Sequence, residues 1–249
     1  MLLKSLASPW AAALLLQATL SGVLIAKRMW RRFPIFLAYC VSSLILNGAL
    51  FLIYVSHWRR PLYFKAYWLT EAIGWLMGLA VVYEIFRHLF RPYPALRKLA
   101  THIFQTAVIL LVLLGCIVAY AQHLGESNHV QAGLMVVDQA SRILEVGLLA
   151  FLFLFASAFG LHWRQYVFGI ASGLGLFAAV ELVGITMRLQ FGITASPIFN
   201  VVRTISYNSS LIIWMSYILS PELATSSSEL PKRAQLEQWN QAIMELIYQ

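Results

Sequence analysis

Long apolar stretches alternate with short polar ones along the whole chain. Seven of them are long enough to cross a bilayer, at 9–26, 33–56, 66–86, 103–122, 131–160, 165–189 and 198–219. The hydrocarbon core of a bilayer is about 30 Å thick, and roughly 20 apolar residues cross it as a helix. Ala107–Val118 is continuously apolar, whereas the strands of a membrane β-barrel alternate. The pattern predicts an all-α, polytopic membrane protein with seven transmembrane helices.

The last part of the sequence, residues 221–249, has a different pattern. It begins with a serine-rich polar segment that is typical of a flexible linker. Three apolar residues then recur at helical spacing among polar ones: Leu236, Trp239 and Ile243. We therefore expect a seven-helix bundle over residues 1–220, followed by a linker and a short amphipathic helix. That helix has three open placements: on the membrane surface, under the bundle, or against a partner protein.

The composition excludes several classes of protein. Of 249 residues, 60% are hydrophobic and 11% are charged, and the mean hydropathy is +0.73. Soluble domains are about 45–50% apolar and about 25% charged. A soluble enzyme, a secreted disulfide scaffold and a disordered chain are therefore excluded. Cys40 and Cys116 both lie in apolar stretches, so neither a disulfide framework nor a metal site is expected.

The net charge of +8 is interpreted as a signal of topology rather than of nucleic-acid binding. Basic residues crowd the cytoplasmic loops of membrane proteins, and here eleven lie on the side of the first, third and fifth predicted loops and the tail, against five on the other side. This bias predicts a membrane protein with its amino terminus outside and its carboxyl terminus in the cytoplasm. Four basic residues directly follow the first stretch, as in a retained helix rather than a cleaved signal peptide: Lys27, Arg28, Arg31 and Arg32.

Ionisable residues inside the predicted helices are the main candidates for function. A charge in the middle of a bilayer costs at least about 2.5–3.5 kcal/mol, so such residues usually face the protein interior or a wet cavity. Asp138, Arg142 and Glu145 are spaced i, i+4 and i+7 and therefore share one helix face. Arg142 can reach both carboxylates from that position.

Three further predicted helices carry polar groups at a similar depth. With a rise of about 1.5 Å per residue, all of these groups fall in the outer half of one bundle, and we expect them to converge. The candidate ligand-binding residues are Glu71, Asp138, Arg142, Glu145, Glu181, Arg203 and Tyr207.

The expected layer contains four carboxylates and two guanidinium groups, which cannot all pair one to one. Either one or two acids stay protonated, or a cation or basic ligand completes the set. A purely structural interpretation is also open, because buried ion pairs can fix helix register without any ligand. Glu84 stands apart from this layer, and we expect it to pair at the membrane interface with Arg87, His88 and Arg91.

Two Gly-x-x-x-Gly patterns occur within the predicted helices, at Gly74–Gly78 and Gly169–Gly173. Glycines at this spacing let two helix backbones approach closely in lipid. We expect both patterns to serve packing within the molecule rather than dimerisation.

The sequence lacks the residues that several membrane activities require. A retinal protein needs a lysine for its Schiff base, and no lysine occurs between Lys98 and Lys232. The six histidines lie in predicted loops or at helix ends, and no His-Glu-x-x-His or Gly-x-Ser-x-Gly motif is present. We therefore expect no enzyme activity, no metal and no cofactor.

Two segments carry a resemblance to known proteins, Glu84–Arg97 (EIFRHLFRPYPALR) and Leu236–Ile243 (LEQWNQAI). They resemble a group of uncharacterised bacterial seven-helix integral membrane proteins. More distantly, the size and helix count are similar to the amino-terminal seven-helix sensor regions of some bacterial histidine kinases. About 30 residues follow the seventh stretch, so a sensor of this kind is expected to signal through a separate protein.

Together these features favour a sensor-like or receptor-like bundle in the bacterial inner membrane. Its outward-facing polar cavity would bind a small polar or cationic ligand, or a proton. The tail helix would relay the change to a signalling or membrane partner through Leu236, Trp239 and Ile243. Besides the lipid bilayer and this partner, no nucleic acid is expected. Two alternatives are a small transporter or proton-coupled carrier, and a structural subunit of a membrane complex.

Overall fold

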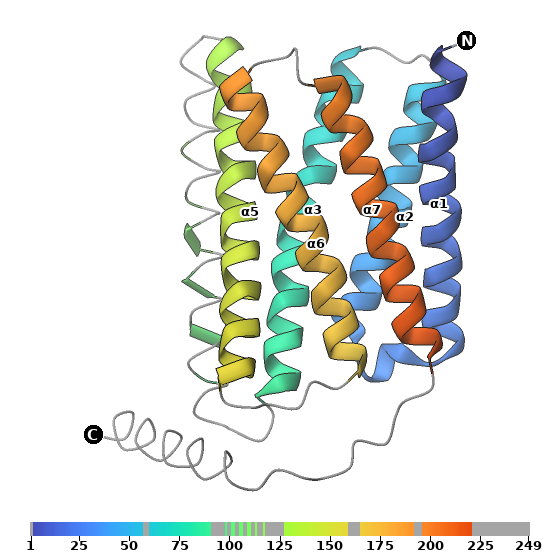
Figure 1. Ribbon diagram of the computed structural model, residues 1–249. Coiled ribbons are helices and arrows are strands. Elements are labelled where there is room, and N and C mark those ends of the chain that lie inside the picture. The colour runs from blue at the N-terminus through green and yellow to red at the C-terminus, as the bar shows by residue number, and fades with distance from the viewer. Residues whose placement is uncertain are drawn as a thin grey trace, which may run out of the picture.

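A computed structural model describes residues 2–56, 60–90, 127–158, 165–191 and 196–220, with isolated residues between 98 and 117. All regular structure in these ranges is helical (Figure 1). The elements are α1 (Leu2–Ala26), the 3-10 helix η1 (Met29–Arg31), α2 (Pro34–Val55), α3 (Arg60–Leu89), α5 (Ser127–Ala158), α6 (Gln165–Phe191) and α7 (Ser196–Leu219).

The all-helical prediction is confirmed, and six of the seven expected helices are present in the described ranges. Most of the expected helix 103–122, including Cys116, lies outside them, so the seventh helix stays a prediction. The residues of that stretch that are described, such as Ile109 and Leu113, are helical. The predicted linker and amphipathic tail, residues 221–249, also lie outside the described part.

Within the described residues, three helices are long and apolar enough to cross a membrane: Pro34–Val55, Leu62–Leu89 and Tyr166–Met187. Their mean hydropathies are 2.1, 1.5 and 1.9. Trp10–Ala26 is a shorter apolar segment. This composition is compatible with a membrane protein.

The distribution of side chains is the reverse of that in a water-soluble bundle. Leu15 and Leu154 are 70% and 72% exposed on the outer faces of their helices. Arg142 and Glu181, in contrast, are 5% and 2% exposed. Apolar groups outside and ionic groups inside are what a bilayer-facing surface requires.

The described helices form a closed ring of neighbours in the order α1, α2, α3, α5, α6 and α7, with α7 returning to α1. Helices that are consecutive in this order pack against each other, and α3 also contacts α6. Figure 1 shows them as one upright bundle in which α6 runs obliquely between α5 and α7. Short connections between antiparallel neighbours account for the pairs α1–α2, α2–α3, α5–α6 and α6–α7.

The apolar core occupies the half of the bundle nearest η1. It is formed by the end of α1, the start of α2, the end of α3 and the facing turns of α5, α6 and α7, as Leu24, Phe36, Ile85, Leu152 and Trp214 illustrate. The other half of the bundle contains most of the buried polar residues. The apolar half near η1 thus holds the helices together, whereas the other half contains the groups for polar chemistry.

The glycines of α6 are packing positions against α7, as the sequence predicted. A side chain at Gly169 would collide with the ring of Tyr217, and one at Gly173 would collide with Trp214. The Trp214 Nε1–H group donates a hydrogen bond to the carbonyl oxygen of Ile170 at 3.1 Å. Absence of side chains at two successive turns thus lets two large aromatic residues lie against the α6 backbone.

The glycine pair of α3 has the expected packing contact within the molecule at Gly78 but not at Gly74. A Cβ atom at Gly74 would meet nothing within 4 Å, whereas one at Gly78 would lie 2.7 Å from the Oε1 atom of Glu145. Gly78 therefore makes room for a carboxylate rather than for another helix backbone.

Glu84 has hydrogen-bond partners that the sequence did not predict, besides the electrostatic influence of the expected neighbours Arg87 and His88; Arg91 lies outside the described residues. Its two carboxylate oxygens accept the backbone N–H groups of Ile35 at 3.0 Å and of Phe36 at 2.8 Å. These N–H groups lie in the first turn of α2, where a helix offers them no internal acceptor. A carboxylate from α3 therefore caps α2, and basic neighbours are not needed to explain its burial at 3% exposure.

Candidate functional site

Arg142 lies at the centre of a charged face on α5. Its Nε atom is 3.6 Å from Oδ1 of Asp138, one turn earlier. Its Nη1 atom donates a hydrogen bond to Oε2 of Glu145, one turn later, at 3.1 Å. Residues three or four apart in a helix lie above one another, and this spacing produces the local part of the site.

Two acids from other helices connect Arg142 to Arg203 of α7. Arg203 Nη2 donates to Oε1 of Glu71 (α3) at 2.7 Å, and Nε lies 2.5 Å from Oε1 of Glu181 (α6). Arg142 Nη2 approaches the other oxygens of these acids, at 3.7 Å for Glu71 and 3.9 Å for Glu181. The four side chains thus alternate in charge around a closed ring, which we call the ion ring (Arg142, Glu71, Arg203, Glu181).

The structure brings together all six charged residues singled out from the sequence, so the expected convergence is observed. The ion ring is formally neutral, while Asp138 and Glu145 add two further carboxylates through Arg142 alone. Side chains of the cluster are 3–25% exposed, with Arg203 the most accessible. Removing one member of a buried ion pair typically costs about 3–5 kcal/mol, so the cluster also contributes to stability.

Three carboxylate oxygens in this cluster lack a hydrogen bond from any described residue: Asp138 Oδ1, Glu145 Oε1 and Glu181 Oε1. Buried polar atoms are seldom left in this way. Asp138 Oδ1 and Glu181 Oε1 lie in ion pairs with arginine Nε atoms, whereas Glu145 Oε1 lies against Gly78. Oxygens without a hydrogen bond thus occur both in the ion ring and outside it.

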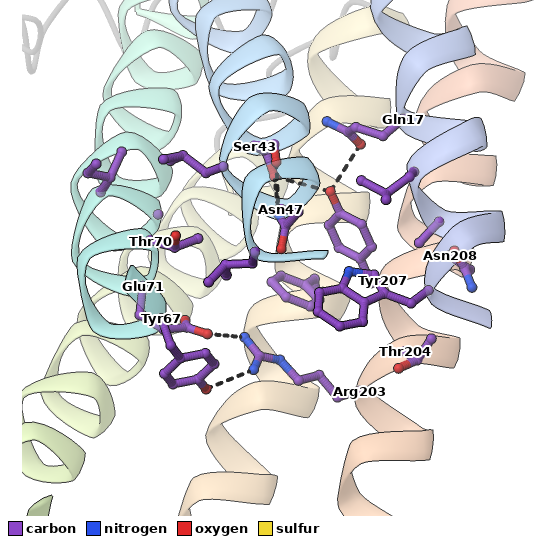
Figure 2. Close-up of a pocket in the computed structure, with 18 of the residues that line it drawn as sticks. Gln17, Ser43, Asn47, Tyr67, Thr70, Glu71, Arg203, Thr204, Tyr207 and Asn208 are labelled. Carbon is purple, nitrogen blue, oxygen red and sulfur yellow. Dashed lines mark hydrogen bonds and ion pairs between the residues drawn. The ribbon is translucent and has the colours of Figure 1, made fainter. Parts of the chain in front are cut away.

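A cavity of about 760 Å³ opens beside the ion ring, between α1, α2, α3 and α7. Of the seven predicted site residues, Glu71, Arg142, Arg203 and Tyr207 line it. Figure 2 shows Arg203 pointing across the cavity towards Glu71 and Tyr67. Its volume is within the usual range of about 300–1,000 Å³ for small-molecule pockets. Asp138, Glu145 and Glu181 do not line the cavity and lie behind its wall.

A chain of four polar side chains crosses the cavity wall from α1 to α2 (Figure 2). Tyr207 Oη donates to Gln17 Oε1 at 3.1 Å, because an amide oxygen only accepts. In the 3.2 Å contact between Ser43 Oγ and Tyr207, Ser43 is then the donor. Asn47 Nδ2 in turn donates to Ser43 Oγ at 3.3 Å. The directions of all three hydrogen bonds in the chain are thus fixed.

Sequence reasoning named Tyr207 but missed its companions Gln17, Ser43 and Asn47, and also Tyr67, which accepts a hydrogen bond from Arg203 Nη1 at 3.2 Å. A signal for them was present. Gln17 interrupts an otherwise apolar stretch, and Ser43 and Asn47 are four residues apart in another. Uncharged polar residues on one face of an apolar helix indicate an interior polar surface.

The described ranges contain no set of three or more His, Cys, Asp or Glu side chains arranged to hold a metal ion. In the cluster, arginines lie between the carboxylates. The site offers hydrogen-bond donors and acceptors, and the two opposite charges of Glu71 and Arg203 line its cavity. Its wall is partly aromatic, because the ring of Phe177 packs edge-to-face on that of Tyr207 with the centroids 5.3 Å apart. These groups suit reversible binding.

No protein-family model, curated protein or solved structure matches the chain. The resemblance to bacterial seven-helix membrane proteins and to kinase sensor regions therefore stays a prediction.

Proposed function

We propose that the chain is a seven-helix, sensor-like or receptor-like protein of the bacterial inner membrane, without catalytic activity. Its amino terminus would lie outside and its carboxyl terminus in the cytoplasm. The cavity would bind a small polar or cationic ligand, or a proton. The observation that carries this proposal is that the cavity wall includes part of a buried ion ring contributed by four helices.

The coupling follows from how the ring is connected. A ligand in the cavity can contact Glu71 and Arg203 directly, since both line it. Each of these residues also holds a second partner, Arg142 for Glu71 and Glu181 for Arg203. A ligand that competes for either charge changes the pairing of α5 and α6, and it favours the helix arrangement in which it binds better.

The signal would leave the bundle through the predicted tail helix. Leu236, Trp239 and Ile243 would contact a separate signalling or membrane partner. Because these residues lie outside the described ranges, this step rests on the sequence pattern alone.

The test is a thermal-unfolding screen of the purified protein against a library of small polar and cationic compounds at several pH values. Wild type should show a ligand-dependent rise in Tm that Arg203→Ala abolishes. Ser209→Ala is the control, because Ser209 is exposed on the same helix and bonds its own backbone at Ile205. Wild type without any ligand-dependent or pH-dependent shift would contradict the proposal.

A small transporter or proton-coupled carrier is a second candidate. It is favoured by the oxygens of Asp138 and Glu145 that accept no hydrogen bond from any described residue, since intramembrane carboxylates commonly serve as proton relays. A carrier moves its substrate or protons across the membrane of a proteoliposome, whereas a sensor does not. Substrate or proton flux through the purified protein would therefore select this candidate.

A further inference from the structure

The connection between α1 and α2 gathers positive charge around a buried anchor. Met29 and Phe33 of this connection are 3% and 4% exposed and belong to the apolar core. The basic residues around them form what we call the basic corner: Lys27, Arg28, Arg31 and Arg32. All four are exposed, so the connection is fixed from inside and charged outside.

The basic corner surrounds a hollow of about 380 Å³. Its lining consists of the four basic residues, Met29 and Tyr166 at the start of α6. No acidic side chain from the described ranges lines it. The buried carboxylate of Glu84, which contacts the start of α2, already uses both oxygens on backbone N–H groups. Among the described residues, Lys27, Arg28 and Arg31 thus make the lining of the hollow positively charged.

Several contacts hold the basic corner in one shape. Lys27 Nζ donates to the carbonyl oxygen of Ile218 on α7 at 2.6 Å. Arg28 has φ 54°, the one positive φ of a non-glycine residue in the described ranges, a conformation that persists only where its surroundings impose it. The Arg31 guanidinium lies over the Trp30 ring, 4.9 Å from its centre. The cations are thus arranged before any ligand arrives, which reduces the entropic cost of binding.

The position of the hollow identifies its ligand. Trp10–Ala26 ends directly before Lys27, Pro34–Val55 begins directly after the corner, and Tyr166–Met187 begins at a residue of the lining. The ends of apolar helices lie at the level of the lipid headgroups. We propose that the basic corner binds the phosphate of an anionic phospholipid headgroup, which guanidinium groups can contact through two N–H groups at once.

The experiment measures lipid binding to the purified full chain in neutral detergent, by native mass spectrometry and by thermal unfolding. The probes are phosphatidylglycerol, phosphatidylcholine and glycerol 3-phosphate. We expect phosphatidylglycerol to bind preferentially and to raise Tm. In Arg28→Gln/Arg31→Gln its affinity should fall roughly 30-fold, at about 1 kcal/mol for each charge lost. Binding of phosphatidylcholine should not change.

The matched control removes two positive charges at the opposite end of the bundle, in Arg60→Gln/Lys65→Gln at the start of α3. It should keep the preference for phosphatidylglycerol. Arg28→Lys/Arg31→Lys retains the charge but loses the contact through two N–H groups, so its affinity should lie between those of wild type and the glutamine variant, and its preference for phosphatidylglycerol should remain even if the glutamine variant does not fold. An equal loss in the control, loss of the lipid preference in the lysine variant, or no preference of wild type for the anionic lipid would overturn the proposal. Full competition by glycerol 3-phosphate would assign the hollow to a soluble phosphate compound instead.

Discussion

At the scale of single residues, the position of the Glu145 carboxylate depends on its close contacts with Arg142 and Gly78. Glu145 is held by Arg142 at 3.1 Å on one oxygen, and its other oxygen lies against Gly78. The carboxylate cannot move away from α3 without giving up the guanidinium contact. Because Gly78 has no side chain, the Glu145 carboxylate has room to take this position in the charged cluster.

Gly78→Ala should lower the free energy of unfolding by about 1–3 kcal/mol, because the added methyl group would force the Glu145 carboxylate out of place. Gly74→Ala is a matched control in the same helix, since its Cβ would meet nothing within 4 Å. That change should be neutral or stabilise by up to about 1 kcal/mol. Denaturant unfolding of both variants in the same detergent measures the difference. Equal effects would show that Gly78 has no special contact.

At the scale of elements, the start of α2 depends on a side chain that is 48 residues away in sequence. The side chain that caps the N-terminus of a helix usually belongs to the residue directly before the helix. Here Phe33 precedes α2 and gives no side-chain cap, and Glu84 of α3 supplies the acceptors. The contact ties α2 to α3 at the end of the bundle that contains the apolar core.

Glu84→Gln should destabilise the protein by about 1–3 kcal/mol, because an amide offers one acceptor where two N–H groups need one each. The loss of protection from hydrogen exchange should be confined to the start of α2. Hydrogen exchange should become faster at the amides of Ile35 and Phe36 while amides near Asp138 on α5 keep their protection. Unchanged exchange at both α2 amides would contradict the capping role.

At the scale of the whole molecule, the ion ring connects four helices through two arginines. Its adjacent and oppositely charged members Glu71 and Arg203 come from α3 and α7, which both border the cavity. Breaking this pair should therefore affect the bundle as a unit.

A double-mutant cycle tests that expectation. Glu71→Gln and Arg203→Met should each cost about 3–5 kcal/mol in free energy of unfolding. The double variant should cost less than both together, with a coupling energy of about 0.5–3 kcal/mol. Arg203→Met with Glu84→Gln is the control pair, which should be additive within about 0.5 kcal/mol since the two sites lie at opposite ends of the bundle. Additivity in the first pair would mean that the ring does not act as a unit.

The charged cluster could be predicted from the sequence because the physics leaves little freedom. A helix is rigid, its rise per residue is known, and Asp138, Arg142 and Glu181 are too costly to face lipid. The cavity wall was missed because uncharged polar residues have a cheaper option. Ser21 and Thr19, for example, bond carbonyl groups of their own helix, so a single hydroxyl in an apolar stretch is a weaker signal than several uncharged polar residues on one helix face.

The partner of Glu84 could not be predicted for a different reason. Basic residues follow it at helical spacing, and this local pattern is the only one visible along the chain. The groups it contacts are backbone N–H groups of α2. Every residue except proline has such a group, so the contact leaves no trace in the sequence pattern.

Because one half of the bundle is apolar and the other polar, the half-helices that border the cavity can tilt about the packed core near η1. A half-helix of 13 residues is about 20 Å long, so a tilt of about 3° at the core moves its far end by about 1 Å. Such a displacement matches the differences in length among the contacts of the ion ring, which lie between 2.5 and 3.9 Å. The cavity end can therefore exchange one ion pair for another while the core end stays packed.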